Sequence, residues 1–109
     1  MAVTIVIQRT VPDKEMADRL APMIVQLRSK AATQPGFLTG QTFSCLDCQG
    51  EYMVISTWHS LDDWNRWKNS KERQELQNKV DALLGEETQY RIYQPVVGGI
   101  IPEFKGTET

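Results

Sequence analysis

Residues 51–84 read EYMVISTWHSLDDWNRWKNSKERQELQNKVDALL, a strand followed by a long, interrupted helical segment. The part Glu51–His59 is rich in β-branched and aromatic side chains, which is typical of a strand. Ser60 then supplies a hydroxyl ahead of acidic residues, a pattern that favours the start of a helix. Asn69 and Ser70, followed by Glu72, form a second capping signal. We therefore expect the helix to break or change direction there.

The preceding segment adds a strand and a turn. Residues 37–45 (FLTGQTFSC) read as a strand. Alternate side chains of a strand lie on one face, which here groups Phe37, Thr39, Gln41 and Phe43. The short polar connection 47–50 predicts that this strand and the next form an antiparallel hairpin.

The N-terminal part predicts another strand and a helix. Val3–Arg9 (VTIVIQR) is a β-branched run with little alternation, so we expect both of its faces to be covered. Apolar residues then recur at spacings of three and four, as on one face of a helix: Ala17, Leu20, Ile24, Leu27 and Ala31. Pro22 conflicts with this helix, because an interior proline costs about 3 kcal/mol. We expect a kink there; the alternative, two shorter helices, preserves the topology.

The C-terminal part completes the pattern. The last helical segment ends at Gly85, and Thr88–Tyr93 (TQYRIY) reads as the final strand. The order β-α-β-β-α-β is the ferredoxin-like, α+β arrangement. Right-handed crossovers then place two helices on one face of a four-stranded antiparallel sheet. We expect one domain over residues 1–94 and a C-terminal arm or tail over 95–109.

The second face of this sheet predicts a homodimer. It carries apolar and aromatic side chains that no further element of the chain covers, and such a face is unfavourable in water. A second copy, packed sheet to sheet, would cover it. Apolar residues of the tail are expected to reach onto the partner: Val96, Val97, Ile100 and Ile101.

Composition excludes some classes of function. Twelve basic and fourteen acidic residues give a formal charge of −2, which argues against a nucleic-acid binder. No apolar stretch is long enough to span a bilayer, and no signal peptide is recognisable, so we expect a cytoplasmic protein. Cys45 and Cys48 form a CxxC at the hairpin tip. We interpret them as two loop thiols, reduced because no export signal is recognisable, and a zinc site would need two more ligands.

The sequence resembles the antibiotic biosynthesis monooxygenase (ABM) family of dimeric α+β barrels. The resemblance covers roughly Val3 to Gln94 and is carried by QPGFLTGQTF at 34–43 and by the stretch from Val54 to Leu84. It implies a ligand pocket between the helices and the sheet of each subunit. Members include cofactor-free monooxygenases acting on polyketide quinols and anthrones, quinol monooxygenases and haem-degrading enzymes.

The resemblance also suggests site residues. Trp67 matches the tryptophan that lines the pocket in the haem-degrading and quinol-oxidising members, and Trp64 lies one turn before it. An indole offers a flat wall for an aromatic ligand and a hydrogen-bond donor. The alternative is that both tryptophans only pack between helix and sheet.

Haem degradation is not expected. The positions that match the family's haem-binding histidine and its first-strand asparagine are Gln77 and Gln8, and glutamine is a poor ligand for haem iron. The only histidine, His59, lies at the end of a strand, away from that helix. The chain also has no phosphate-binding glycine motif and no metal-binding HExxH, so we expect neither a cofactor nor a metal.

Two functions remain open. The first is a cofactor-independent monooxygenase that oxidises a small aromatic molecule with dioxygen. Its candidate residues are Trp67, Trp64, Phe43 and Gln77 around the substrate, Gln8 as a donor to a substrate oxygen, and Tyr90 or His59 in proton transfer. The second is a non-catalytic dimer that binds a small apolar ligand in the same pocket.

Overall fold

The computed structural model describes residues 1–96 and residue 98. Four strands and three helices follow one another as β1 (Val3–Thr10), α1 (Lys14–Ala31), β2 (Phe37–Ser44), β3 (Glu51–Trp58), α2 (Leu61–Lys68), α3 (Lys71–Leu84) and β4 (Tyr90–Tyr93). Val97, Ile100 and Ile101, which we expected to reach a partner, lie outside the described residues.

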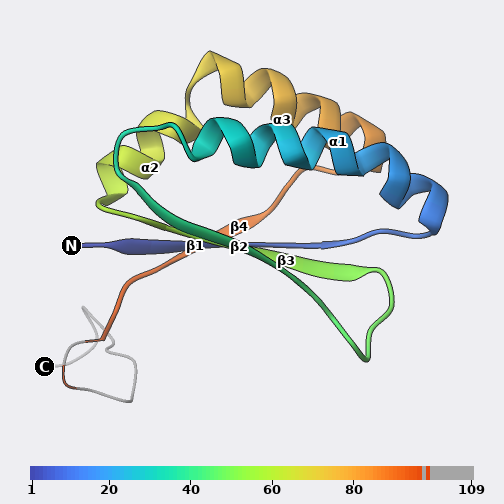
Figure 1. The fold of residues 1–109 in the computed structure, drawn as a ribbon, viewed down its shortest axis with the longest axis horizontal. Coiled ribbons are helices and arrows are strands. Elements are labelled where there is room, and N and C mark those ends of the chain that lie inside the picture. Colours follow the sequence, from blue (N-terminus) through green and yellow to red (C-terminus); the bar gives the residue numbers. More distant parts are fainter. Residues whose placement is uncertain (97, 99–109) are drawn as a thin grey trace, which may run out of the picture.

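The strands form one antiparallel sheet in the order β2-β3-β1-β4. All three helices lie on the same side of it (Figure 1). The predicted ferredoxin-like α+β fold is therefore confirmed, with the second helical segment divided into α2 and α3. No helix of the described part is long and apolar enough to cross a membrane.

Local capping explains where the helices begin. The carboxylate of Asp13 accepts from the backbone N–H of Met16 at 2.9 Å, and this bond starts α1. Ser60 and Ser70 accept in the same way at the starts of α2 and α3, so the predicted break at residues 69–70 is confirmed. The helix α1 continues through Pro22 as one element, so the alternative of two shorter helices is wrong. A kink at Pro22 stays a prediction.

The register of β2 is irregular near its start. The pairing with β3 shifts between Phe37 and Thr39, which leaves Leu38 as an extra residue. Phe37 pairs with Trp58, whereas Phe43 pairs with Met53, and Met53 lies an odd number of positions from Trp58 along β3. Alternation along β3 therefore puts Phe43 on the face opposite to that of Phe37. The expectation that the two share a face is wrong for this reason.

The core lies between the sheet and the helices. One buried cluster joins β1 and β3 to α2, and a second joins the C-terminal end of β1 to α1 and α3. The outer sheet face has no helix over it in the described part (Figure 1). It carries the half-buried Val6, Met53 and Ile55 and the exposed Phe43 and Tyr93.

Candidate functional site

A cavity of about 410 Å³ lies between the helices and the inner face of the sheet. This volume falls within the range of small-molecule sites, roughly 300–1,000 Å³. The strands contribute mainly apolar and small side chains: Ile7, Phe37, Gly40, Val54, Ser56 and Trp58. The helix α1 contributes apolar residues together with Arg28 and Ser29, and α2 and α3 contribute Trp64, Trp67, Arg73 and Gln77.

One part of the cavity is built from aromatic rings. Trp58, Trp64 and Trp67 are 0%, 2% and 4% exposed, respectively, and all three line the cavity. Trp58 packs edge to face against Phe37, with ring centroids 5.4 Å apart, and against Trp64 at 5.8 Å. The indole N–H of Trp58 donates to the Ser56 hydroxyl at 3.1 Å. These contacts hold Trp58 and Trp64 in place as flat walls.

Another part of the cavity is polar and buried. Arg9 and Arg73 are each 6% exposed and Gln77 is 7% exposed, and all three line the cavity. Arg9 donates to the Tyr52 hydroxyl at 3.2 Å and to the Thr88 hydroxyl at 3.0 Å. Arg73 donates to the Gln77 side-chain oxygen at 3.3 Å, and the Gln77 amide donates to Thr88 at 2.7 Å. The two guanidinium groups thus belong to one hydrogen-bonded chain.

Two features mark Arg73 as a desolvated cation. Its guanidinium carbon lies 5.3 Å from the centre of the Trp64 ring, a cation–π distance. Burial lowers the pKa of Arg73 from its ordinary value, and the positive charge of Arg9 lowers it further, whereas Tyr90 and Asp81 raise it. At pH 7 the group remains charged, because arginine starts from a very high pKa.

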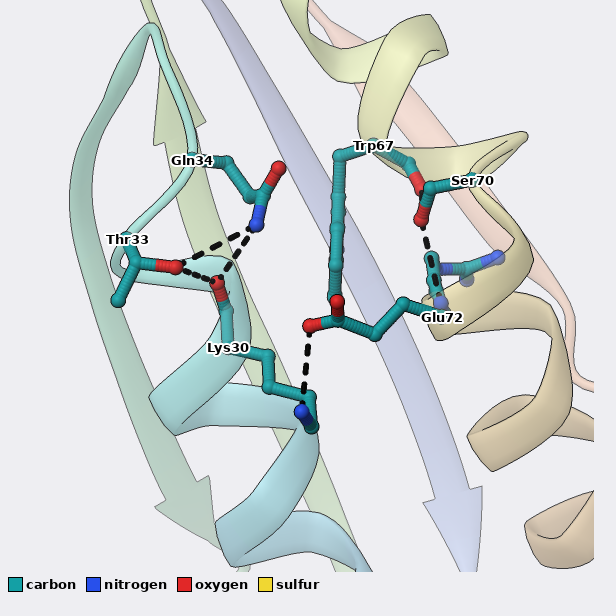
Figure 2. Close-up of polar contacts among 7 residues, drawn as sticks. Lys30, Thr33, Gln34, Trp67, Ser70 and Glu72 are labelled. Carbon is teal, nitrogen blue, oxygen red and sulfur yellow. Dashed lines mark hydrogen bonds and ion pairs between the residues drawn. The ribbon is translucent and has the colours of Figure 1, made fainter.

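A surface ion pair joins the end of α1 to the start of α3. The Lys30 ammonium on α1 lies 3.3 Å from the Glu72 carboxylate on α3 (Figure 2). Both side chains are about half exposed, so the pair contributes little stability. The Ser70 hydroxyl donates to the Trp67 carbonyl at 2.8 Å, which ties Trp67 to the start of α3. The pair thus links the end of α1 to the helix that carries Arg73.

The structure brings together only part of the predicted site. Trp64, Trp67 and Gln77 line the cavity, whereas Gln8, Phe43, His59 and Tyr90 do not.

Each of these four residues lies elsewhere for a visible reason. Gln8 is exposed on the outer sheet face, opposite Met53. Phe43 shares that face. The His59 side chain is 77% exposed, 3.8 Å from Asp63. Tyr90 lies behind Trp64, with ring centroids 5.7 Å apart.

Sequence reasoning missed Arg9 and Arg73. Alternation from Ile5 and Ile7 does place position 9 on the inner face of β1. Arg73 likewise lies three and four positions before Leu76 and Gln77, on the inner face of α3. These spacings were the available signals, but a charged residue is usually assigned to the surface.

The CxxC lies apart from this cavity, at the tip of the β2–β3 hairpin. The structure joins Cys45 and Cys48 in a disulfide, in place of the two free thiols that we expected. The tight turn brings their Cα atoms within 5.3 Å, a separation that suits a disulfide. In this form neither sulfur is a thiolate that binds metal.

Solved structures of several proteins share the fold. SnoaB, a cofactor-independent oxygenase from Streptomyces nogalater, is 19% identical, with a TM-score of 0.73 over 90% of this chain and 98% of its own. A conserved protein from Methanosarcina mazei Go1 is 16% identical, with a TM-score of 0.77 over 86% and 92%. Rv0793 from Mycobacterium tuberculosis is 14% identical, with a TM-score of 0.75 over 88% and 96%. At such identities the likeness shows a common fold.

The sequence itself gives the family. No curated protein sequence matches this chain. The model of the family described as "Antibiotic biosynthesis monooxygenase" matches residues 2–79, well over half of the chain. The match includes every residue that lines the cavity. The chain therefore belongs to the antibiotic biosynthesis monooxygenase family.

Proposed function

We propose that this protein is a cofactor-independent monooxygenase that oxidises a small aromatic substrate, such as a quinol, a phenol or a polyketide-like ring system, with dioxygen. The observation that carries the proposal is the cavity walled by the buried Trp58, Trp64 and Trp67. Family membership and the fold shared with SnoaB, which is described as a cofactor-independent oxygenase, support it.

The proposed chemistry relies on the substrate. An electron-rich aromatic anion reduces dioxygen itself; one oxygen atom then enters the ring carbon and the other leaves as water. A phenol with a hydrogen on the reacting carbon thus yields a quinone and water, with atoms and electrons balanced. The protein has to orient the ring and keep bulk water away. Trp67 and Trp64 would orient the ring. Gln77, whose amide hydrogens bond to Asp81 and Thr88, would hold Arg73 in place at the polar part of the cavity.

A specific observation favours the alternative, a non-catalytic binding protein. Among the described residues that line the cavity there is no histidine, cysteine, tyrosine, lysine or carboxylate. A general base with a pKa near neutrality is therefore missing from the lining. A substrate that ionises easily in water does not need such a base, whereas a substrate with a high pKa does.

Oxygen uptake tests the proposal. Purified protein, freed of metal by a chelator, is mixed with a panel of hydroquinones, anthrones and flavonols. Trp67→Ala is compared with Leu46→Ala, a fully exposed apolar residue at the hairpin tip that serves as the control. We expect turnover by the wild type and the control, and at least a tenfold loss in Trp67→Ala. Ligand binding without oxygen uptake across the panel would favour the binding protein instead.

We also propose that two copies pair through their outer sheet faces. The apolar side chains of that face support this arrangement, because water would otherwise contact them. The cavity of each copy lies on the other side of the sheet, so each copy would hold its own ligand.

A further inference from the structure

The polar part of the cavity carries an unbalanced positive charge. Arg9 and Arg73 are both buried, and within the described residues neither forms an ion pair with a carboxylate. Asp81 reaches them only through other groups: it accepts from Gln77 and from Thr88, which bond to Arg73 and Arg9. Within this hydrogen-bonded group, two guanidinium charges against one carboxylate leave one positive charge; Glu86 and Glu87 line a neighbouring cavity with Arg9, but no ion pair joins them to it within the described residues. Buried charges are usually paired, so this imbalance needs a partner.

The same region holds two buried donors without an acceptor. Within the described part of the chain, the Nε of Arg9 and the Nε1 of Trp64 have no hydrogen-bond partner. Both residues line the cavity. A buried donor left unpaired is unfavourable. These two atoms are themselves enclosed by protein, whereas a negatively charged oxygen in the cavity would balance the charge of the lining guanidinium groups.

The rest of the lining defines what carries that oxygen. A third arginine, Arg28 of α1, also lines the cavity but is exposed to solvent; beyond the arginines the walls are mainly aromatic and aliphatic, from Ile7, Ile24 and Leu27 to the three tryptophans. A small inorganic anion would leave this apolar volume without a partner. A flat ring with an anionic oxygen at one end fits both parts of the cavity.

We propose that Arg9 and Arg73 form an oxyanion site that binds the ionised oxygen group, phenolate or carboxylate, of an aromatic ligand whose ring lies against the tryptophans. The inference deepens the proposed function by assigning the charge state of the ligand. It requires the cavity to be the ligand site but does not require turnover. Binding the substrate as an anion would also supply the electron-rich form that reacts with dioxygen.

Binding without oxygen separates this inference from catalysis. Calorimetry under nitrogen compares 2-naphthoate with 2-naphthamide, which has the same ring and nearly the same shape but no charge. We expect the naphthoate to bind at least tenfold more tightly. A nitronaphthol, whose ionisation is visible by absorbance, tests the phenolate: its pKa should fall by about 1 unit or more when bound, the effect of a nearby opposite charge.

Variants locate the effect. Arg73→Gln should weaken naphthoate binding at least tenfold and leave naphthamide binding within a factor of about two. Arg73→Lys, which keeps the charge, should retain much of the preference for the anion. Arg19→Gln removes an exposed arginine of α1 outside the cavity and is the control; it should change neither affinity.

Several results would overturn the inference. Equal affinity of the wild type for naphthoate and naphthamide would contradict the oxyanion site and would indicate a pocket that recognises only the aromatic ring. This comparison uses the wild type alone, so it does not depend on whether a variant folds. If Arg19→Gln weakened naphthoate binding as much as Arg73→Gln does, the preference for the anion would reflect general attraction by surface charge and not the two buried arginines. Tight binding of inorganic phosphate, without preference for the aromatic acid, would indicate an adventitious ion only. If neither naphthalene bound at millimolar concentration, the cavity would not be an aromatic site and the proposed function would fail as well.

Discussion

Arg9 and Thr88 are joined by a hydrogen bond of 3.0 Å, although 79 positions separate them in the sequence. Arg9 is near the end of β1, and Thr88 precedes β4. The Thr88 hydroxyl also accepts from Gln77 on α3 and donates to Asp81. A single hydroxyl therefore links a strand, a helix and a loop at the polar part of the cavity.

Replacing this hydroxyl should destabilise the protein. In Thr88→Val the Arg9 guanidinium and the Gln77 amide both lose an acceptor in a part-buried region. We expect the free energy of unfolding to fall by about 1–3 kcal/mol. Urea unfolding followed by circular dichroism measures it. Thr33→Val, which removes an exposed hydroxyl bonded only to nearby groups in the sequence, should cost less than about 0.5 kcal/mol. Equal losses in the two variants would contradict the linking role of Thr88.

The glycine before β2 should not tolerate a side chain. Gly36 has a φ of 85°, and a Cβ there would overlap the Asp63 carboxylate. Gly85 has a similar φ of 73° but open space around it. Gly85→Ala should therefore cost only the backbone strain, about 1–2 kcal/mol. Gly36→Ala should cost at least about 1 kcal/mol more, since overpacking adds to that strain. Equal unfolding free energies for the two variants would show that Asp63 moves aside freely.

Asp63 should contribute a pH-dependent part of the stability. The Ser60 hydroxyl, at 2.9 Å, and then Arg66, at 2.8 Å, hold the pKa of Asp63 below its ordinary value. A carboxyl group whose pKa is lower in the folded state than in the unfolded state stabilises the folded state. This contribution is fully present when the pH is above the pKa of the unfolded state, near 4, and disappears as the pH falls through the pKa of the folded state. The difference in unfolding free energy between wild type and Asp63→Asn should therefore be largest near pH 7 and shrink below about pH 4.

A matched variant checks this assignment. Asp62 is exposed and lies beside Asp63 in the same first turn of α2. Unfolding midpoints of Asp62→Asn, measured at the same series of pH values, should follow those of the wild type. A wild-type-like acid profile for Asp63→Asn would be incompatible with the predicted contribution.

The outer sheet face should control assembly. Ile55 is half-buried in the middle of that face, on the central strand β3. A charge there would be desolvated in a sheet-to-sheet dimer, so Ile55→Asp should shift a wild-type dimer to monomer in sedimentation equilibrium. Leu46→Asp, at the fully exposed hairpin tip, should remain dimeric. A wild type that sediments as a monomer at micromolar concentration would refute the pairing.

The fold could be predicted from local signals because most of them agree. Ser60 and Ser70 mark helix starts by the chemistry of their hydroxyls, and Gly85 ends α3 in the left-handed conformation that favours glycine. These signals do not depend on distant residues. The order of elements therefore followed directly from the sequence.

The site was harder to predict because it depends on single-residue shifts. Gln8 and Arg9 are neighbours, yet only Arg9 lies on the inner face of β1, since one position changes the side of a strand. The bulge at Leu38 has the same effect on β2 and moves Phe43 to the outer face. Pairing partners far along the chain decide such details, and they also allow a charged residue such as Arg73 to be buried.

All three tryptophans of the chain belong to the wall of one cavity. The intrinsic fluorescence of this protein therefore originates almost entirely from that wall, with no surface indole to dilute the signal. A ligand that enters should change the emission by contact or by energy transfer, and the Arg73 charge over the Trp64 ring makes that indole sensitive to a neighbouring anion. The protein thus carries an optical reporter of its own occupancy, and unknown compounds can be screened without any label.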